Sequence, residues 1–126
     1  MRSGRGAAAT LTRELVEGRG VGVLVDQKFQ RGPPVPFFGT PAPTNPLIAR
    51  LARHTGGEVV PVRCVRLPGN RYRVEIERPI LLPRTAEGNE RGEVDVAAGL
   101  ALVNGKVEGW VREHPEQWMW FHRRWG

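Results

Sequence analysis

Cysteine is almost absent from this chain of 126 residues, in which Cys64 is the only one. No disulfide can therefore form within the chain, which excludes a disulfide-stabilised secreted domain and fits a reducing compartment. No apolar run approaches the roughly 20 residues that a membrane-spanning helix needs, and the first residues lack the apolar stretch of a signal peptide. We therefore expect one compact unit exposed to the cytoplasm, with Cys64 as a buried structural thiol.

Lysine and acidic residues are also scarce. Of the 19 basic residues only Lys28 and Lys106 are lysines, and the 13 acidic residues leave a formal net charge of +6. Guanidinium groups bind anionic oxygens in a bidentate manner, so the excess of arginine favours partners that carry phosphate or carboxylate groups. A coding bias toward arginine is the alternative explanation.

The end of the chain combines aromatic and basic residues. Residues 114–125 read His-Pro-Glu-Gln-Trp-Met-Trp-Phe-His-Arg-Arg-Trp and hold three of the four tryptophans beside two arginines. Tryptophan favours partial burial and guanidinium groups favour phosphates or aromatic faces, so the mixture suits a phosphate-rich or membrane interface. The alternative is a terminal helix that docks through its tryptophans and leaves its arginines in solvent.

Apolar spacing predicts three helices and three strands. The predicted helices cover residues 7–17, 46–56 and 96–110, and the predicted strands cover residues 21–25, 58–65 and 71–77. Either Thr44 or Asn45 is expected to cap the second helix. One face of the last strand is expected to contact water.

Prolines interrupt residues 28–46, where we expect a long loop without a regular element. The loop carries Phe37 and Phe38, whose rings we expect to be buried in the core. Asp26 and Gln27 precede the loop, directly after the predicted strand 21–25. In open α/β sheets such a strand end is where ligands bind.

Four segments, in matching order and spacing, resemble the bacterial lipid A late acyltransferases. They are Gly22-Val23-Leu24-Val25-Asp26-Gln27, Val35-Pro36-Phe37-Phe38-Gly39 with Thr44 after it, Val59-Val60-Pro61-Val62, and the ending from Pro115 to Trp125. The resemblance runs from about Arg5 to Trp125. It implies the α/β fold of the glycerolipid acyltransferase type, a mixed sheet flanked by helices, with residues 1–126 as the C-terminal part of a single acyltransferase domain.

What the resemblance implies about function is acyl transfer in lipopolysaccharide biosynthesis. The donor would be acyl carrier protein and the acceptor a hydroxyl of a lipid A precursor of the Kdo2-lipid IVA type. The reaction would take place at the cytoplasmic face of the inner membrane, to which this chain would be peripheral. No metal and no other cofactor is implied.

The general base of that family, a histidine followed five positions later by aspartate or glutamate, is absent from the chain. Val59 stands five positions after His54 and Met119 five positions after His114, and His122 lies too close to the end. The Glu58 four residues after His54 is interpreted as a coincidence. We therefore expect no catalytic residue here and no activity from this chain alone, because a general base contributes about 10²- to 10⁴-fold of rate.

The resemblance also assigns candidate substrate-binding residues. They are Arg5, Asp26, Gln27, Thr44, Arg123 and Arg124. By this resemblance Arg5 would stabilise an oxyanion or hold an acceptor phosphate, Asp26 would orient the acceptor sugar, and the two terminal arginines would meet phosphates. The structural alternatives are a solvated Arg5, an Asp26 that caps a turn, a helix-capping Thr44 and terminal arginines that serve solubility.

Two other functions remain open at this point. One is transfer to a different glycolipid, such as a mannosylated phosphatidylinositol. The other is a basic nucleic-acid-binding module that uses phosphate contacts and base stacking. The nucleic-acid hypothesis explains neither Asp26-Gln27 nor Phe37-Phe38-Gly39, so we expect no nucleic-acid partner.

Overall fold

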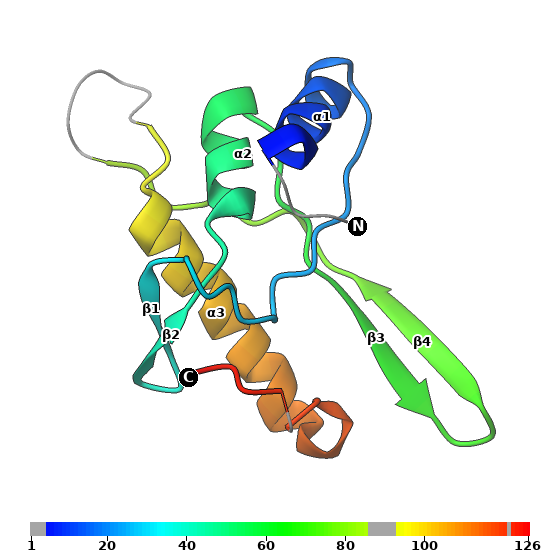
Figure 1. Ribbon diagram of the computed structural model, residues 1–126. Helices are drawn as coiled ribbons and strands as arrows, with labels where there is room; N and C mark the ends of the chain where they lie inside the picture. The colour runs from blue at the N-terminus through cyan, green and yellow to red at the C-terminus, as the bar shows by residue number, and fades with distance from the viewer. Residues whose placement is uncertain (1–4, 86–92, 121) are drawn as a thin grey trace.

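The computed structural model describes residues 5–85, 93–120 and 122–126, without the side chain of Arg5. Its elements alternate between helices and hairpins (Figure 1). In chain order they are α1 (Arg5–Val16), β1 (Pro34–Phe37), β2 (Thr40–Pro43), α2 (Leu47–Thr55), β3 (Val62–Leu67), β4 (Arg71–Ile76), α3 (Val96–Glu113) and the 3₁₀ turn η1 (Pro115–Gln117). The α/β class is confirmed, and the strands form two separate antiparallel hairpins.

The long helix α3 organises the molecule. It packs against α2 and against the β1–β2 hairpin, and α1 packs on α2, whereas the β3–β4 hairpin projects away from the helices (Figure 1). Asp95 caps α3, because its carboxylate accepts a hydrogen bond at 3.1 Å from the backbone N–H of Ala98. The predicted helix over residues 96–110 is therefore confirmed, and it continues to Glu113.

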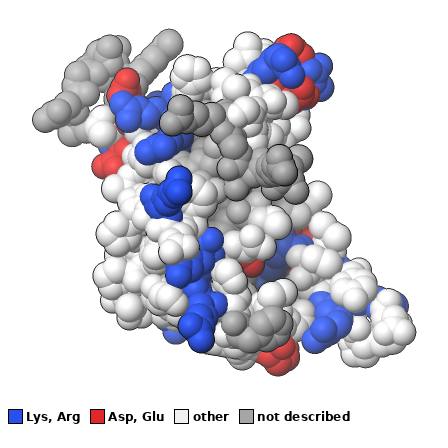
Figure 2. Space-filling view, viewed as in Figure 1, with Lys and Arg blue, Asp and Glu red and all other residues white. Residues whose placement is uncertain are grey.

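Basic side chains outnumber acidic ones on the face shown in Figure 2. A row of lysine and arginine side chains runs down the face shown in Figure 2, with few acidic side chains between them. No helix within the described ranges is both long enough and apolar enough to cross a membrane.

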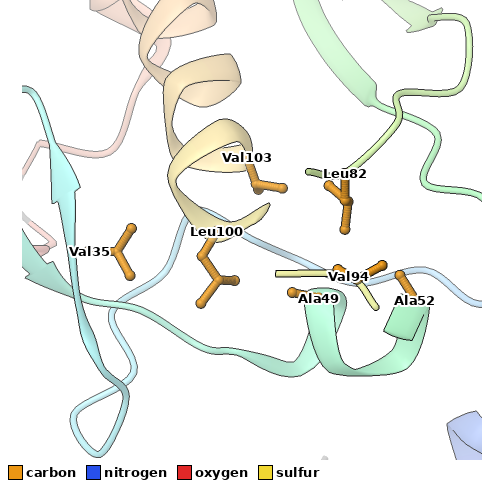
Figure 3. Packing of buried hydrophobic residues seen from close by; sticks show 7 residues of the cluster. All are labelled: Val35, Ala49, Ala52, Leu82, Val94, Leu100 and Val103. Carbon is orange, nitrogen blue, oxygen red and sulfur yellow. The ribbon is translucent and has the colours of Figure 1, made fainter. Parts of the chain in front are cut away.

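Two clusters of buried apolar side chains hold the elements together. The first joins α2, α3 and β1 with the segments around Leu82 and Val94 (Figure 3), and its members are Val35, Ala49, Ala52, Leu82, Val94, Leu100 and Val103. The second fixes the β1–β2 hairpin and the end of the chain to the C-terminal half of α3, and its buried members are Phe37, Ala42, Val107 and Val111. A helix that buries one stripe of apolar residues gains most of its stability from such packing.

The expectation of an irregular loop over residues 28–46 is wrong, because this segment forms the β1–β2 hairpin. Phe38 and Gly39 make its two-residue turn with φ values of 51° and 75°, as a type I′ turn requires. Proline faces proline at the pairs Pro34↔Pro43 and Pro36↔Pro41. The Phe37↔Thr40 pair next to the turn exchanges two backbone hydrogen bonds. Because bonded and non-bonded pairs alternate along an antiparallel hairpin, both proline pairs are non-bonded pairs, in which no N–H is needed.

The predicted strand over residues 21–25 does not form, since these residues have no strand partner within the described part of the chain. A strand needs a second strand whose backbone groups it can pair with, and the apolar pattern of residues 21–25 does not show whether such a strand lies beside them. The strands predicted over residues 58–65 and 71–77 correspond to β3 and β4, and β3 begins at Val62.

One burial expectation for the β3–β4 hairpin is wrong, and the other is exceeded. Cys64 is exposed, because side chains alternate along β3 and it is the neighbouring Val65 that is buried. On β4 the apolar side chains of Tyr72, Val74 and Ile76 are all more than 60% exposed. The hairpin projects from the body, so neither face of β4 is covered, and more than the one predicted face contacts water.

Candidate functional site

A buried polar cluster of Thr44, Asn104 and Arg124 joins three distant parts of the chain. The Thr44 hydroxyl donates to the carbonyl of Ala42 at 2.8 Å and accepts from Arg124 Nη2 at 3.0 Å and from Asn104 Nδ2 at 3.3 Å. All three side chains are at most 3% exposed. The hydroxyl thus uses its full hydrogen-bonding capacity, which is what a buried polar group requires.

Arg124 is the most unusual member of this cluster, because its guanidinium is buried without a hydrogen bond to a carboxylate of any described residue. Nη1 donates to the Pro43 carbonyl at 2.6 Å, and the guanidinium lies 5.2 Å from the centre of the Phe37 ring. Burial lowers the pKa of Arg124, and attraction to Asp26 opposes that shift. Arginine remains charged in proteins, so the interior next to Asp26 carries a fixed positive charge.

Aromatic rings close the second core cluster around the end of the chain. The Phe37 ring packs at 5.7 Å from Trp118 and 5.3 Å from Trp125, and Trp125 Nε1 donates to the Phe37 carbonyl at 3.0 Å. The expectation that Phe37 is buried is confirmed. Met119 and Trp120 are instead 59% and 56% exposed, so the tryptophan-rich ending has one packed part and one part that faces outward.

Two further hydrogen bonds fix the loop after Asp26 and the turn of the hairpin. The backbone N–H of Lys28 donates to His122 Nε2 at 2.9 Å, and the backbone N–H of Phe38 donates to Glu108 at 2.6 Å. The acceptor nitrogen of His122 cannot carry the proton in this arrangement. The end of the chain therefore holds the segment that follows the Asp26-Gln27 pair.

The structure brings only some of the predicted site residues together. Thr44 and Arg124 are in direct contact, and half-buried Asp26 lies close enough to Arg124 to attract it. Gln27 and Arg123 are exposed. Arg5 is the first residue of α1, and its side chain lies outside the described part.

Two structural alternatives for these residues are wrong. Thr44 does not cap α2, because its hydroxyl points into the buried cluster; the Asn45 side chain accepts from the N–H of Leu47 at 3.0 Å instead. Arg124 does not serve solubility either, because it is 1% exposed. The terminal arginines also differ from each other, since Arg123 points to solvent.

Asp26 lines a hollow of about 270 Å³ together with His114 and apolar side chains of β3 and α3. His114 Nδ1 lies 3.6 Å from a carboxylate oxygen of Glu116, beyond hydrogen-bond range. Among the described residues no group of three or more His, Cys, Asp or Glu side chains is placed to hold a metal ion. The site therefore offers a carboxylate beside a fixed cation and an apolar wall.

Sequence reasoning missed Asn104, Glu108, Gln117 and His122 as structural partners of the site. A signal was present for Asn104, which interrupts the apolar stripe of α3 between Leu100 and Val107. A polar residue on a buried stripe indicates a buried hydrogen-bond partner. The other three residues gave no such signal, because their partners are backbone groups that lie far away in the sequence.

Comparison with protein families gives a match to nearly the whole chain. The model of a family described as bacterial lipid A biosynthesis acyltransferase matches residues 3–126 of the chain. No curated protein matches it. The matched residues include all four segments on which the sequence resemblance rests.

Proposed function

The chain belongs to the bacterial lipid A biosynthesis acyltransferase family, and we propose that it forms the acceptor-binding, C-terminal part of an acyltransferase domain. The transferred group would be a fatty acyl chain carried by acyl carrier protein, and the acceptor a hydroxyl of a lipid A precursor of the Kdo2-lipid IVA type. The observation that carries this proposal is the family match over nearly the whole chain. A glycolipid such as a mannosylated phosphatidylinositol is the alternative acceptor.

Asp26 is the proposed centre of acceptor binding. Its carboxylate is half-buried at the rim of a hollow and lies beside the fixed charge of Arg124. A carboxylate in this position can accept hydrogen bonds from sugar hydroxyls. Gln27 and Arg123, both exposed, are proposed to contact the acceptor and its phosphates, and Arg5 is proposed to contact an acceptor phosphate.

Arg124 and Thr44 are proposed to act through their neighbours. Both are buried and mutually hydrogen-bonded, so they hold the end of the chain against the β1–β2 hairpin and keep a positive charge near Asp26. Acyl transfer also requires a base that deprotonates the acceptor hydroxyl. Because the described histidines have no orienting carboxylate in hydrogen-bond contact, we propose that this chain alone does not catalyse the transfer.

The exposed part of the ending is the proposed membrane contact. Met119, Trp120 and Arg123 are exposed close together in the sequence, and aromatic rings with basic side chains favour the headgroup region of a membrane. Two of the three terminal tryptophans pack on Phe37. They are therefore not free to stack on bases, which weakens the nucleic-acid alternative.

Vesicle sedimentation tests the proposal. Vesicles that contain lipid A precursor should bind the wild-type chain more tightly than vesicles of phosphatidylcholine or of phosphatidylinositol mannoside. Asp26→Asn should weaken the preference about tenfold, the cost of a hydrogen bond to a charged group. The matched control is Glu17→Gln, which neutralises an exposed carboxylate just after α1 that does not line the hollow. Equal binding to all three vesicles, or equal losses in both variants, would contradict the proposal.

Binding to single-stranded DNA is measured in parallel. A preference for DNA over the lipid A precursor vesicles, with a steep salt dependence, would favour the nucleic-acid alternative. An acyl transfer assay with the chain alone should give no product. If the chain alone forms product, and Arg5→Ala abolishes that product, the proposed inactivity is contradicted.

A further inference from the structure

A separate hollow of about 800 Å³ opens between α1 and α2. The two helices pack against each other at the top of Figure 1, and the hollow shares no lining residue with the one at Asp26. Sites for small molecules have volumes of roughly 300–1,000 Å³. This α1–α2 hollow therefore has room for a sugar with its substituents.

Three basic side chains of α2 line the α1–α2 hollow. They are Arg50, Arg53 and His54, which share one face of the helix because residues at i, i+3 and i+4 are neighbours there. The side chains that α1 contributes are two alanines and a threonine, so this helix adds no charge. Like charges at such a spacing repel each other. A bound anion would relieve that repulsion, whereas a bound cation would add to it.

The charge that remains unpaired in the hollow is positive. Glu93 is the one carboxylate among the described residues of the lining, and it forms an ion pair with Arg53. The exposed side chains of Arg50 and His54 make no hydrogen bond and no ion pair with any described residue. The carboxylates in and directly after α1 bind Arg19 instead. Arg50 therefore keeps its five N–H donors for a ligand.

Asn45 adds an uncharged donor to the same hollow. Its Oδ1 accepts a hydrogen bond from the Leu47 N–H at 3.0 Å, which fixes the orientation of the amide. The Nδ2 group has no acceptor within the described ranges, and the side chain is half-buried in the lining. An amide N–H₂ group beside a guanidinium offers several donors, which the oxygens of a phosphate group can accept together.

The α1–α2 hollow lies close to Asp26 along the chain. Phe29 is part of its lining and follows Asp26 by three residues, a stretch that spans at most about 11 Å. The segment is fixed, because the Phe29 N–H donates to the Pro43 carbonyl at 3.3 Å and the Lys28 N–H donates to His122. A phosphorylated disaccharide can bridge such a span. One ligand can therefore place a hydroxyl at Asp26 and a phosphate in the α1–α2 hollow.

We propose that the α1–α2 hollow is a phosphate subsite, in which Arg50 binds a phosphate group of the acceptor and Asn45 and His54 donate beside it. The inference rests on the proposed function for the source of that phosphate. It narrows the acceptor to a glycolipid that carries a phosphate one or two sugar rings from the reacting hydroxyl. Because Glu93 already neutralises Arg53, the hollow has charge for a single phosphate group.

Vesicle sedimentation with two forms of the acceptor tests the subsite. One set of phosphatidylcholine vesicles carries lipid A precursor, and the other carries the same precursor after a phosphatase has removed its phosphates. Arg50→Gln should weaken binding to the first set about tenfold, the effect of hydrogen bonds to a charged group. The matched control Arg66→Gln removes an exposed charge of β3 that does not line the hollow, and it should weaken binding less than about twofold.

Removal of the phosphates should weaken binding of the wild-type chain about tenfold and leave Arg50→Gln almost unaffected. Equal losses in the two arginine variants would overturn the subsite, because any lost positive charge would then have the same effect. Dephosphorylated precursor that binds the wild type as tightly as the intact precursor would overturn it as well.

Nuclear magnetic resonance with inorganic phosphate separates this inference from the proposed function. Phosphate should shift the side-chain signals of Asn45 and Arg50 in the wild-type chain and equally in Asp26→Asn. Unshifted signals would overturn the subsite, even where the preference for lipid A precursor vesicles that depends on Asp26 is observed. Shifted signals in a chain without that preference would support a site for free phosphate and overturn the glycolipid as its source, together with the proposed function.

Discussion

Arg124 donates a hydrogen bond to the hydroxyl of Thr44 across 80 residues of sequence, and both side chains are buried. This contact fixes the end of the chain to the residue that follows the β1–β2 hairpin. The same guanidinium bonds the Pro43 carbonyl and covers the Phe37 ring. Part of the end of the chain, whose composition favours an interface at the surface, therefore belongs to the interior.

Arg124→Met should destabilise the protein by about 2–3 kcal/mol, because the Pro43 carbonyl is left without this buried donor and the Thr44 hydroxyl loses one of its bonds. The matched control is Arg123→Met, which removes an exposed guanidinium one position earlier and should change stability by less than about 0.5 kcal/mol. Urea unfolding followed by circular dichroism measures both. Similar losses in the two variants would show that the burial of Arg124 contributes nothing.

Phe37→Ala should cost about 3–5 kcal/mol, the range found when a buried aromatic side chain is truncated. The ring is 1% exposed and contacts both Trp118 and Trp125, so tryptophan fluorescence should shift to longer wavelength. Tyr72→Ala serves as the control, because Tyr72 is 65% exposed. An unchanged emission spectrum in the Phe37 variant would contradict the packing described for the end of the chain.

The elements that the sequence predicts well are those whose signal is local. The helix α2 ends at Gly56 with φ of 70°, and glycine there is a local stop signal. The apolar stripe of α3 is likewise contained in one segment. The family could be inferred as well, because its motifs are short blocks at fixed spacing.

The features that could not be predicted depend on partners distant in sequence. Residues 21–25 have the pattern of a strand, but no edge within the described residues pairs with them. The prolines argued against strands in the β1–β2 hairpin, because proline lacks the N–H that a strand donates. Only the register shows that these prolines lie at positions where no N–H is required. The burial of Arg124 depends on acceptors at Pro43 and Thr44, which its own neighbourhood does not indicate.

The ion pairs of Arg63 predict a loss of stability in acid. Hydrogen bonding to Arg63 lowers the pKa of Glu75 below its ordinary value of 4.5. A carboxylate with a lowered folded pKa contributes stability that is fully present above the unfolded pKa and is lost as the pH falls through the folded pKa. Glu75→Gln should therefore lower the urea midpoint at pH 7, and the difference from wild type should narrow below pH 4.5.

The matched control for that experiment is Glu58→Gln, which removes an exposed carboxylate that forms no ion pair with a described residue. Its urea midpoint should follow that of the wild type at every pH. A difference between wild type and Glu75→Gln that stays constant down to pH 3 would contradict the linkage, since ionisation of Glu75 would then not contribute to folding.

Cys64 should react with a maleimide in the native protein. The thiol is exposed on the outer face of β3, so the reagent needs no unfolding to reach it. The reaction rate in buffer should lie within about threefold of the rate in concentrated urea, because access is not limiting in either state. Protection of about a hundredfold or more in buffer would indicate that another surface covers this face.

Two glycines should respond to alanine in opposite directions. A Cβ atom on Gly32 would lie 1.9 Å from the Thr44 carbonyl oxygen, and the backbone of the hairpin must shift to relieve that contact. Gly32→Ala should therefore cost about 3 kcal/mol. Gly105 lies inside α3 with nothing within 4 Å of its would-be Cβ, so Gly105→Ala should stabilise the protein by about 0.5–1 kcal/mol through helix propensity. Thermal unfolding of the two variants beside wild type gives the signs, and a Gly32 variant as stable as wild type would place the Thr44 carbonyl away from Gly32.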